Sequence, residues 1–289
     1  MPALCAVAHI RRLRGGSQSH LLRGSDGQPW VVKFQNNPQS VRVLANEMLA
    51  TRLGHLLRLP MPAVEVIEVP DWLVTNTPEL RMETGGSKTP CSAGQQLASR
   101  YVHGSDGLTF DYLPDAALSK VRNLQDLARC LVLDKWTCNS DGRQAVFTKS
   151  GRGFAATLID QGYCFNAGEW NFPDSPLRGI CPRPSAYENV TGWESFEPAL
   201  SLAEGMPLET LRACADGIPE EWYGNDNDAL DGLIETLYRR RSRIRSLIES
   251  FRKSTRNPFP HWGGSKQEFL PEGRSTLYSG SGAAMRTGP

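Results

Sequence analysis

The sequence has little of what marks several large classes of protein. No apolar run approaches the roughly 18 residues that a membrane-spanning helix needs. The formal net charge is only +1, so the clear basic excess typical of nucleic-acid-binding domains is missing. Arg11, Arg12 and Arg14 follow a weakly apolar start, without the order or length of a signal peptide. We therefore expect a cytoplasmic protein with no membrane span and no DNA partner.

Paired cysteines and metal-spaced histidines are also lacking. The seven cysteines are scattered, odd in number and form no C-x-x-C pair, which excludes an obvious disulfide framework or zinc site and fits a reducing compartment. His20, His55, His103 and His261 have no metal-ligand spacing with cysteine or acidic residues. With 39% hydrophobic and 22% charged residues, the chain can build a packed core, as one large domain or two lobes.

Hydrophobic periodicity predicts strands and one helix in the first hundred residues. Residues 20–23 and 29–34 flank a Gly-Ser-Asp-Gly turn, which indicates a β-hairpin. Leucines spaced as on a helix predict a helix over 41–58, and a strand follows over 61–69. Residues 76–96 are rich in Thr, Gly, Ser and Pro, and we interpret them as a long surface loop.

The second half begins with a helix predicted over 124–137. A tight hairpin is predicted next, with strands over 145–149 and 154–159. An apolar stripe predicts a final helix over 228–253. The Gly/Ser/Pro-rich remainder has little to bury, so we expect residues 254–289 to form a flexible tail.

A glycine-rich turn, Gly15-Gly16-Ser17-Gln18-Ser19, is the first feature with chemical meaning. Small residues let backbone N–H groups approach phosphate oxygens, and the hydroxyls can add donors. An ordinary hairpin turn has the same composition, so the turn alone does not decide between the two interpretations.

Lys33 lies in the apolar strand Trp30–Phe34, and Glu47 lies on the helix that follows. In kinase-like folds a strand lysine contacts the α- and β-phosphates of ATP and is held by a helix carboxylate. A solvent-facing lysine on an alternating strand is the alternative explanation.

The segment 134–162 carries the strongest signal. An apolar strand ends at Asp160-Gln161-Gly162, the arrangement in which kinases present a magnesium ligand at a sharp turn. Asp141 lies earlier, in the turn between helix and hairpin, where a catalytic carboxylate would orient an acceptor hydroxyl. Asn139 and Arg143 flank it in the same turn and are further catalytic candidates. Turn aspartates are also common for structural reasons.

At these residues the chain resembles the HipA-like kinases and, more distantly, the type II phosphatidylinositol 4-kinases, whose catalytic loop also has an N-x-D turn after a helix. The stretches similar to a bacterial HipA-like subfamily are GQQLASRYVHG, DKWTCNSDGRQAVF, LIDQGYCFNAGEWNFPDSPLRG, GWESFEPAL and IPEEWYG. The resemblance covers most of residues 10–253 and implies an α+β, bilobal protein-kinase-like fold. Residues 1–100 would form the β-rich N-lobe and residues 101–253 the mostly helical C-lobe.

The resemblance also implies roles for the residues named above. ATP phosphates would be held by Lys33 and the Gly15–Ser19 turn, with Glu47 pairing Lys33. The connector residues Tyr101 and Val102 would lie near the adenine. Asp141 would be the catalytic carboxylate, and Asp160 would bind Mg²⁺.

One departure from the kinase pattern leaves alternatives open. Val146 stands where kinases usually have a metal-binding Asn, five residues after the catalytic Asp, and Gln144 is the nearest oxygen donor. Asp134 and Asn139 have the D-x-x-x-x-N spacing themselves, although periodicity places Asp134 within the helix and so favours Asp141. The departure also admits a pseudokinase that binds nucleotide without turnover.

The resemblance implies a protein substrate phosphorylated on Ser or Thr, and a lipid or small-molecule kinase is a further alternative. The basic run Arg239–Arg245 on the last helix is either a solvated helix face or a docking patch for an acidic partner.

Overall fold

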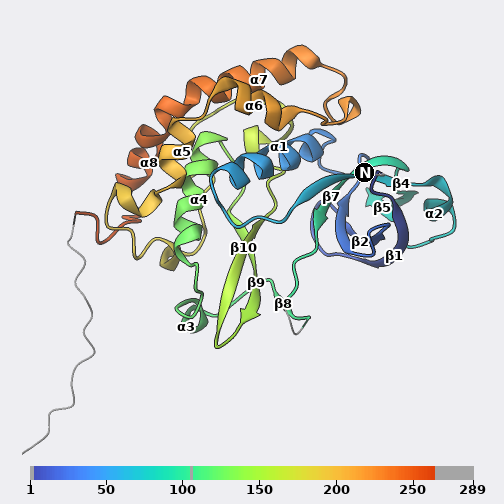
Figure 1. The fold of residues 1–289 in the computed structure, drawn as a ribbon, viewed down its shortest axis with the longest axis horizontal. Coiled ribbons are helices and arrows are strands. Elements are labelled where there is room, and N and C mark those ends of the chain that lie inside the picture. Colours follow the sequence, from blue (N-terminus) through green and yellow to red (C-terminus); the bar gives the residue numbers. More distant parts are fainter. Residues whose placement is uncertain (1–2, 105–106, 264–289) are drawn as a thin grey trace, which may run out of the picture.

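The computed structural model describes residues 3–104 and 107–263, which form a β-rich N-terminal lobe and a mostly helical C-terminal lobe (Figure 1). The N-terminal half contains β1 (Ala6–Arg12), β2 (His20–Gly24), β3 (Pro29–Lys33), α1 (Arg42–Leu56), β4 (Val64–Val69), α2 (Asp71–Thr75), β5 (Arg81–Thr84), β6 (Ser87–Pro90) and β7 (Gly94–Arg100). The C-terminal half contains β8 (Thr109–Phe110), α3 (Asp115–Leu118), α4 (Gln125–Trp136), β9 (Gln144–Ser150), β10 (Gly153–Ile159), α5 (Ala199–Glu204), α6 (Leu208–Ala215), α7 (Asn227–Arg240) and α8 (Ile244–Arg252). This confirms the predicted α+β class.

The N-terminal sheet is antiparallel throughout, with strand order β1-β2-β3-β7-β4. A bridge between Cys5 and Glu68 links its two outer strands, so the sheet curls on itself. Side chains such as Leu22, Trp30 and Val32 alternate inward and form a separate small core. The predicted hairpin over 20–34 is confirmed as β2–β3.

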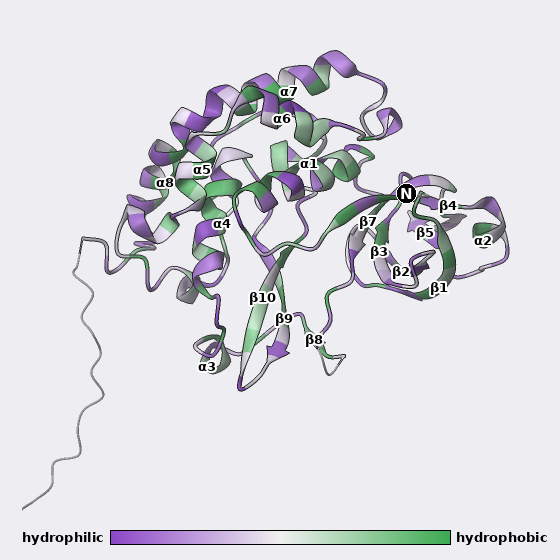
Figure 2. Cartoon of the chain, viewed as in Figure 1, coloured by the Kyte–Doolittle hydropathy of each residue, from purple (hydrophilic) through white to green (hydrophobic). Residues whose placement is uncertain are grey.

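Helix α1 packs against the C-terminal lobe as well as the sheet. Its apolar residues, among them Leu44, Met48 and Leu53, share one core with helix α4. Because nearly the whole helix is buried, its polar residues also need partners. Asn46 finds them in the C-terminal lobe, donating to the carbonyl oxygens of Gly162 (2.9 Å) and Ala167 (2.7 Å). In Figure 2, hydrophobic residues colour both α1 and α4.

The C-terminal lobe is built around α4, and the hairpin β9–β10 projects away from it (Figure 1). Trp136 of α4 is fully buried and donates to the carbonyl oxygen of Leu237, 2.8 Å away. The hairpin register pairs Gln144 with Ile159 at its base and Ser150 with Gly153 at its free end. The predicted helix and hairpin are thus confirmed, and the hairpin base lies beside the turn that carries Asp141.

Three sequence predictions differ from the structure. Residues 76–96 are not a structureless loop, because they contain the hairpin β5–β6 and the start of β7. The side chains of β6 are all exposed, so no alternating pattern marks it, whereas Met82 of β5 is buried in the sheet core. The final helix predicted over 228–253 is two α-helices, α7 and α8, joined by a short 3-10 helix over Arg241–Arg243.

The third difference concerns the start of the predicted tail. Phe259 is buried against Tyr187 and Phe251, and its ring stacks on Trp262. The packed lobe therefore extends past residue 253. Residues 264–289 of the predicted tail lie outside the described residues. Within the described part of the chain, no helix has both the length and the apolar character needed to cross a membrane.

His20 is a buried titratable group in the N-terminal lobe. It is fully buried at the start of β2, and its Nδ1 lies 3.1 Å from Nε2 of His9. Burial, and to a smaller extent the neighbouring His9, lower the pKa of His20 to about 4. The neutral imidazole is therefore the form that the folded lobe accommodates.

We predict that the lobe loses stability as pH falls from about 6.5 towards 4, because the unfolded chain binds a proton there that folded His20 does not. The loss should be roughly 1–3 kcal/mol. Unfolding midpoints between pH 7.5 and 5 measure it, and His20→Gln should flatten this dependence. If the unfolding midpoint of the variant depends on pH as steeply as that of wild type, the pH dependence arises from other groups.

Candidate active site between the lobes

Lys33 lies at the end of β3, where the two lobes meet. Its Nζ is 2.8 Å from Oε2 of Glu47 on α1 and 2.8 Å from Oδ1 of Asp160, just after β10. Burial alone would lower the pKa of Lys33, but the two carboxylates outweigh it and raise the pKa above its ordinary value. The side chain is therefore a fixed, buried ammonium group held by both lobes.

Asp160 follows the last residue of β10 and has a left-handed backbone (φ 62°), which turns the chain sharply at that point. Burial would raise the pKa of its carboxyl, but Lys33 lowers it below its ordinary value, so the group is ionised at neutral pH. The same Glu47 Oε2 that binds Lys33 accepts a hydrogen bond from the Gln161 backbone N–H (2.9 Å). The position of Asp160 is thus fixed on both sides.

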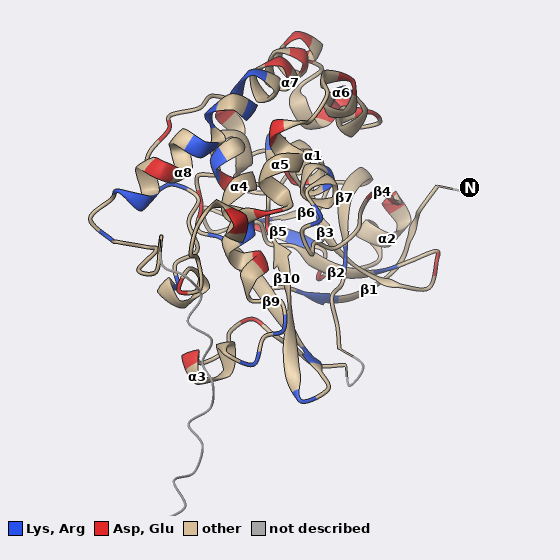
Figure 3. Cartoon of the chain, turned by 60° about the vertical axis from the view of Figure 1, so that its left-hand side comes forward, with Lys and Arg blue, Asp and Glu red and all other residues tan. Residues whose placement is uncertain are grey.

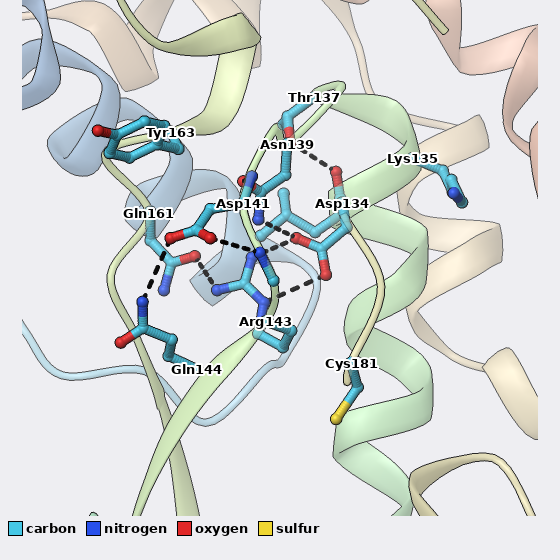
Figure 4. Close-up of polar contacts among 12 residues, drawn as sticks. Asp134, Lys135, Thr137, Asn139, Asp141, Arg143, Gln144, Gln161, Tyr163 and Cys181 are labelled. Atoms are coloured by element: carbon cyan, nitrogen blue, oxygen red, sulfur yellow. Dashed lines mark hydrogen bonds and ion pairs between the residues drawn. The ribbon is translucent and has the colours of Figure 1, made fainter. Parts of the chain in front are cut away.

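Asp141 is brought beside Asp160 although the two lie on different segments. The Gln144 Nε2 at the hairpin base lies 3.3 Å from Oδ2 of Asp141 and 3.4 Å from Oδ2 of Asp160. Asp141 is exposed, and its backbone N–H donates to Oδ1 of Asn139 (3.1 Å). Figure 4 shows Gln144 directed towards Asp141. The exposed carboxylate of Asp141 therefore lies next to the ionised carboxylate of Asp160, which could bind a metal ion.

Asp134 has a different environment. Its carboxylate and the Arg143 guanidinium form an ion pair in which each side chain is only 1% exposed. Asn139 Nδ2 donates to the same carboxylate (2.9 Å), and Arg143 also donates to the side-chain oxygen of Gln161 (Figure 4). The competing register built on Asp134 and Asn139 is therefore closed off from solvent. Arg143 and Asn139 hold the turn rather than face the open side of Asp141.

The Gly15–Ser19 turn joins β1 to β2, and Gln18 fixes its position. The Gln18 Nε2 donates to the carbonyl oxygen of Glu83 (2.7 Å), and its Oε1 accepts from the Glu83 N–H (2.8 Å). Gln18 thereby imitates a strand partner for β5, while Arg12 donates to its Oε1 (2.6 Å). Its side-chain amide is used within the lobe, and its backbone N–H donates to the Gly15 carbonyl oxygen (3.1 Å). The hydroxyl oxygens of Ser17 and Ser19 lie 3.0 Å from each other.

Tyr101 and Val102 follow β7 and connect the two lobes. The Tyr101 N–H donates to the carbonyl oxygen of Pro29 (3.1 Å), which continues the strand pairing. The Val102 carbonyl oxygen accepts from Oγ1 of Thr109 (2.6 Å), so that acceptor is already engaged. Their position between the lobes is the one expected for a connector.

A metal site would have to be small. No group of three or more His, Cys, Asp or Glu side chains is arranged to hold a metal ion in residues 3–104 and 107–263. Val146 is buried in the hairpin and has no ligating atom. Mg²⁺ in phosphate sites uses one or two carboxylates together with phosphate and water oxygens, and Asp160 and Asp141 supply such carboxylates. Gln144 directs its Nε2, and not its oxygen, towards both of them.

A cavity in the described part of the chain lies elsewhere, in the N-terminal lobe. It has a volume of about 890 Å³ and is lined by β1 and the segment from α2 to β6, including Ile10, Leu73, Arg81 and Lys88. None of the predicted site residues lines it. The candidate active site is therefore identified by its paired charges and not by this cavity.

The arginines of the run 239–245 have partners within the chain. Arg240 binds both oxygens of Asp174 (3.0 and 2.7 Å) and backbone carbonyls of α4, and Arg245 binds Glu204 (2.7 Å). Much of the positive charge of the run is balanced internally. An acidic partner at this run stays a prediction, and its basis is weaker than the sequence indicated.

Sequence reasoning missed the residues that support the site. Asn46, Gln161 and Glu83 make the contacts that tie α1, the Asp160 turn and the Gly-rich turn together. A polar Asn beside Glu47 on an otherwise apolar helix was the one available signal. The partners of Gln161 and Glu83 are too distant in sequence to be visible in spacing.

The variants Asp134→Ala and Asp141→Ala should differ in their free energy of unfolding, because Asp134 is buried in an ion pair and Asp141 is exposed. Removing Asp134 leaves the buried Arg143 charge unpaired, and we expect a loss of about 3–5 kcal/mol in the free energy of unfolding. Asp141→Ala should leave this free energy nearly unchanged, since the side chain is exposed. Denaturant titration measures both. Equal losses would contradict the assignment.

Comparison with known proteins identifies the family of the chain and supports its fold. The model of a family described as HipA-like kinase matches residues 7–153. The structure of the chain is similar to a solved structure of the Helicobacter pylori proinflammatory kinase CtkA. The two are 13% identical, the TM-score is 0.50, and the match covers 86% of this chain and 99% of CtkA.

Two solved structures match with a TM-score of 0.47 and 12% identity each. The match to a Golgi casein kinase with Mn/ADP bound covers 86% of this chain and 74% of that chain. The match to a hydra Fam20 with sugar covers 88% of this chain and 87% of that chain. No curated protein matched. The CtkA match supports a kinase-like fold, and the family match supports a phosphotransferase. On the match over residues 7–153, the chain belongs to the HipA-like kinase family.

Proposed function

We propose that the protein transfers the γ-phosphoryl group of ATP to a Ser or Thr hydroxyl of another protein. The observation that carries the proposal is the pairing of Lys33 with both Glu47 and Asp160. A phosphate–metal site needs a buried ammonium group and an ionised carboxylate, here from opposite lobes. Burying such charges is costly and does not stabilise an apolar core, so packing alone does not explain them.

The N-terminal lobe would bind the nucleotide. Lys33 stays charged because its pKa is raised, so it can neutralise phosphate oxygens at any physiological pH. Backbone N–H groups and the hydroxyls of Ser17 and Ser19, which lie 3.0 Å apart, would face the phosphates. Tyr101 and Val102 would border the adenine.

Asp160 would be the principal ligand of Mg²⁺, with Gln144 as a weaker neighbouring donor. The bound ion would neutralise charge on the β- and γ-phosphate oxygens. The lowered pKa of Asp160 keeps its carboxylate ionised for this purpose.

Asp141 would orient the acceptor. Its exposed carboxylate accepts the hydroxyl proton as the hydroxyl oxygen bonds to the γ-phosphorus and the bond to the β-phosphate bridging oxygen breaks. Asn139 and the buried Asp134–Arg143 pair hold the turn that presents it. Most of the rate enhancement would come from positioning and fixed charge.

A pseudokinase is the second candidate, and Val146 favours it. Its buried side chain replaces the usual second metal ligand, and Gln144 supplies only a neutral oxygen. Such a protein would bind ATP through Lys33 and Asp160 without measurable phosphoryl transfer.

Transfer of labelled γ-phosphate from ATP to a protein mixture tests the choice. Wild type should transfer phosphate, and Asp141→Asn should lower the rate about 10²–10⁴-fold because the proton acceptor is lost. Asp111→Asn, an exposed aspartate beyond β8, is the matched control and should retain the rate. No transfer by wild type that still binds ATP would favour the pseudokinase.

Gln18→Ala should release the Gly-rich turn from Glu83. We expect the KM for ATP to rise several-fold with a smaller change in kcat, since a freer turn loses entropy on binding phosphate. Gln28→Ala, in the β2–β3 turn, is the control. An unchanged KM in Gln18→Ala would show that this contact does not position the turn.

A further inference from the structure

Four exposed basic residues gather at the free end of the β9–β10 hairpin. They are Lys120, Arg122, Lys149 and Arg152, and we call them the hairpin cluster. None of them forms an ion pair with an acidic side chain in the described part of the chain. Figure 3 shows basic residues at this end of the hairpin and on the neighbouring segment after α3.

Backbone pairing brings the four residues together from separate segments. The Arg122 N–H donates to the Phe154 carbonyl oxygen (2.9 Å), and the Phe154 N–H donates to the Lys120 carbonyl oxygen (3.0 Å). Lys149 is the register partner of Phe154 on β9. The Arg122 guanidinium lies over the turn, because a side-chain carbon built at Gly151 would be 2.8 Å from its Nη2. Arg152 is in that turn.

The hairpin cluster differs from the arginine run on α7 and α8. There, Asp174 and Glu204 pair with Arg240, Arg243 and Arg245. Arg240 and Arg241 also donate to backbone carbonyl oxygens. At the hairpin, like charges are held close together by main-chain pairing without a counter-charge from the described residues. Such an arrangement is electrostatically unfavourable alone and attracts an anionic group.

The hairpin connects this cluster to the candidate active site. Gln144 stands at its base beside Asp141 and Asp160, and Lys149 stands near its free end. At about 3.3 Å per residue along a strand, Lys149 is about 17 Å from Gln144. An extended polypeptide covers the same distance in about five to seven residues.

We propose that the hairpin cluster binds an acidic segment of the protein acceptor, about five to seven residues from the hydroxyl that is phosphorylated. The proposal rests on the phosphotransfer function proposed above. A peptide fits better than a nucleic acid, since the chain has a net charge of only +1 and the four cations lie at one hairpin end and not along a stripe.

Fluorescence anisotropy with labelled peptides tests the docking step in the absence of ATP. Each peptide has a single serine. In the first peptide four glutamates lie six residues before the serine, in the second they lie six residues after it, and in the third glutamines replace the glutamates. Wild type should bind a glutamate peptide at least about tenfold more tightly than the glutamine peptide at low salt. Arg122→Ala/Lys149→Ala/Arg152→Ala should lose this difference.

Arg58→Ala/Arg212→Ala/Arg256→Ala removes three exposed arginines on other elements and should bind as wild type does. Undiminished glutamate-peptide binding by the hairpin variant would overturn the proposal. So would tighter, cluster-dependent binding of a single-stranded RNA or of vesicles rich in phosphatidylserine.

Phosphorylation of the same peptides separates docking from catalysis. The glutamate peptide should have a KM at least about tenfold lower than the glutamine peptide in wild type and equal to it in the hairpin variant. Cluster-dependent binding without any phosphorylation of a bound peptide would refute the link to an acceptor. In that case, failed transfer with every protein substrate would reject the proposed function itself.

Discussion

The buried ammonium group of Lys33 is the contact on which the rest of the site depends. A charge removed from water is tolerated only where opposite charges and hydrogen bonds compensate for it. Glu47 from α1 and Asp160 from the end of β10 provide that compensation at 2.8 Å each. Because Glu47 also accepts the Gln161 N–H, one carboxylate fixes the strand lysine, the helix and the turn after β10 together. This arrangement orients Asp160, and together with the Asn46 hydrogen bonds and the core shared by α1 and α4 it joins the two lobes.

A second buried pair supports the other half of the site. Asp134 and Arg143 neutralise each other beneath the turn, and Asn139 links that pair to the backbone of Asp141. Asp134 and Asp141 are the same residue type at short separation, yet one is enclosed and the other open. Because their environments differ, Asp134 supports the turn, whereas Asp141 is open to a substrate, as the proposed function requires.

Several elements could be predicted from the sequence because their signals are local. The leucine spacing of α1 and the turn chemistry of β9–β10 are visible in short windows, and the order of Lys33, Glu47 and Asp160 matched a known family pattern. The hairpin β5–β6 lacked alternation, since one of its strands is wholly exposed. The engagement of Gln18 by Glu83 and of Arg240 by Asp174 could not be predicted, because each depends on packing between segments distant in the chain.

Calorimetric titration of ATP, with and without Mg²⁺, tests most directly whether Lys33 and Asp160 form a nucleotide–metal site. Asp160→Asn keeps the size of the side chain and removes its charge, and Asp111→Asn is the control. The account predicts that Mg²⁺ strengthens ATP binding to wild type and to the control but not to Asp160→Asn. An equal effect of Mg²⁺ on all three proteins, or no ATP binding to wild type, would contradict it.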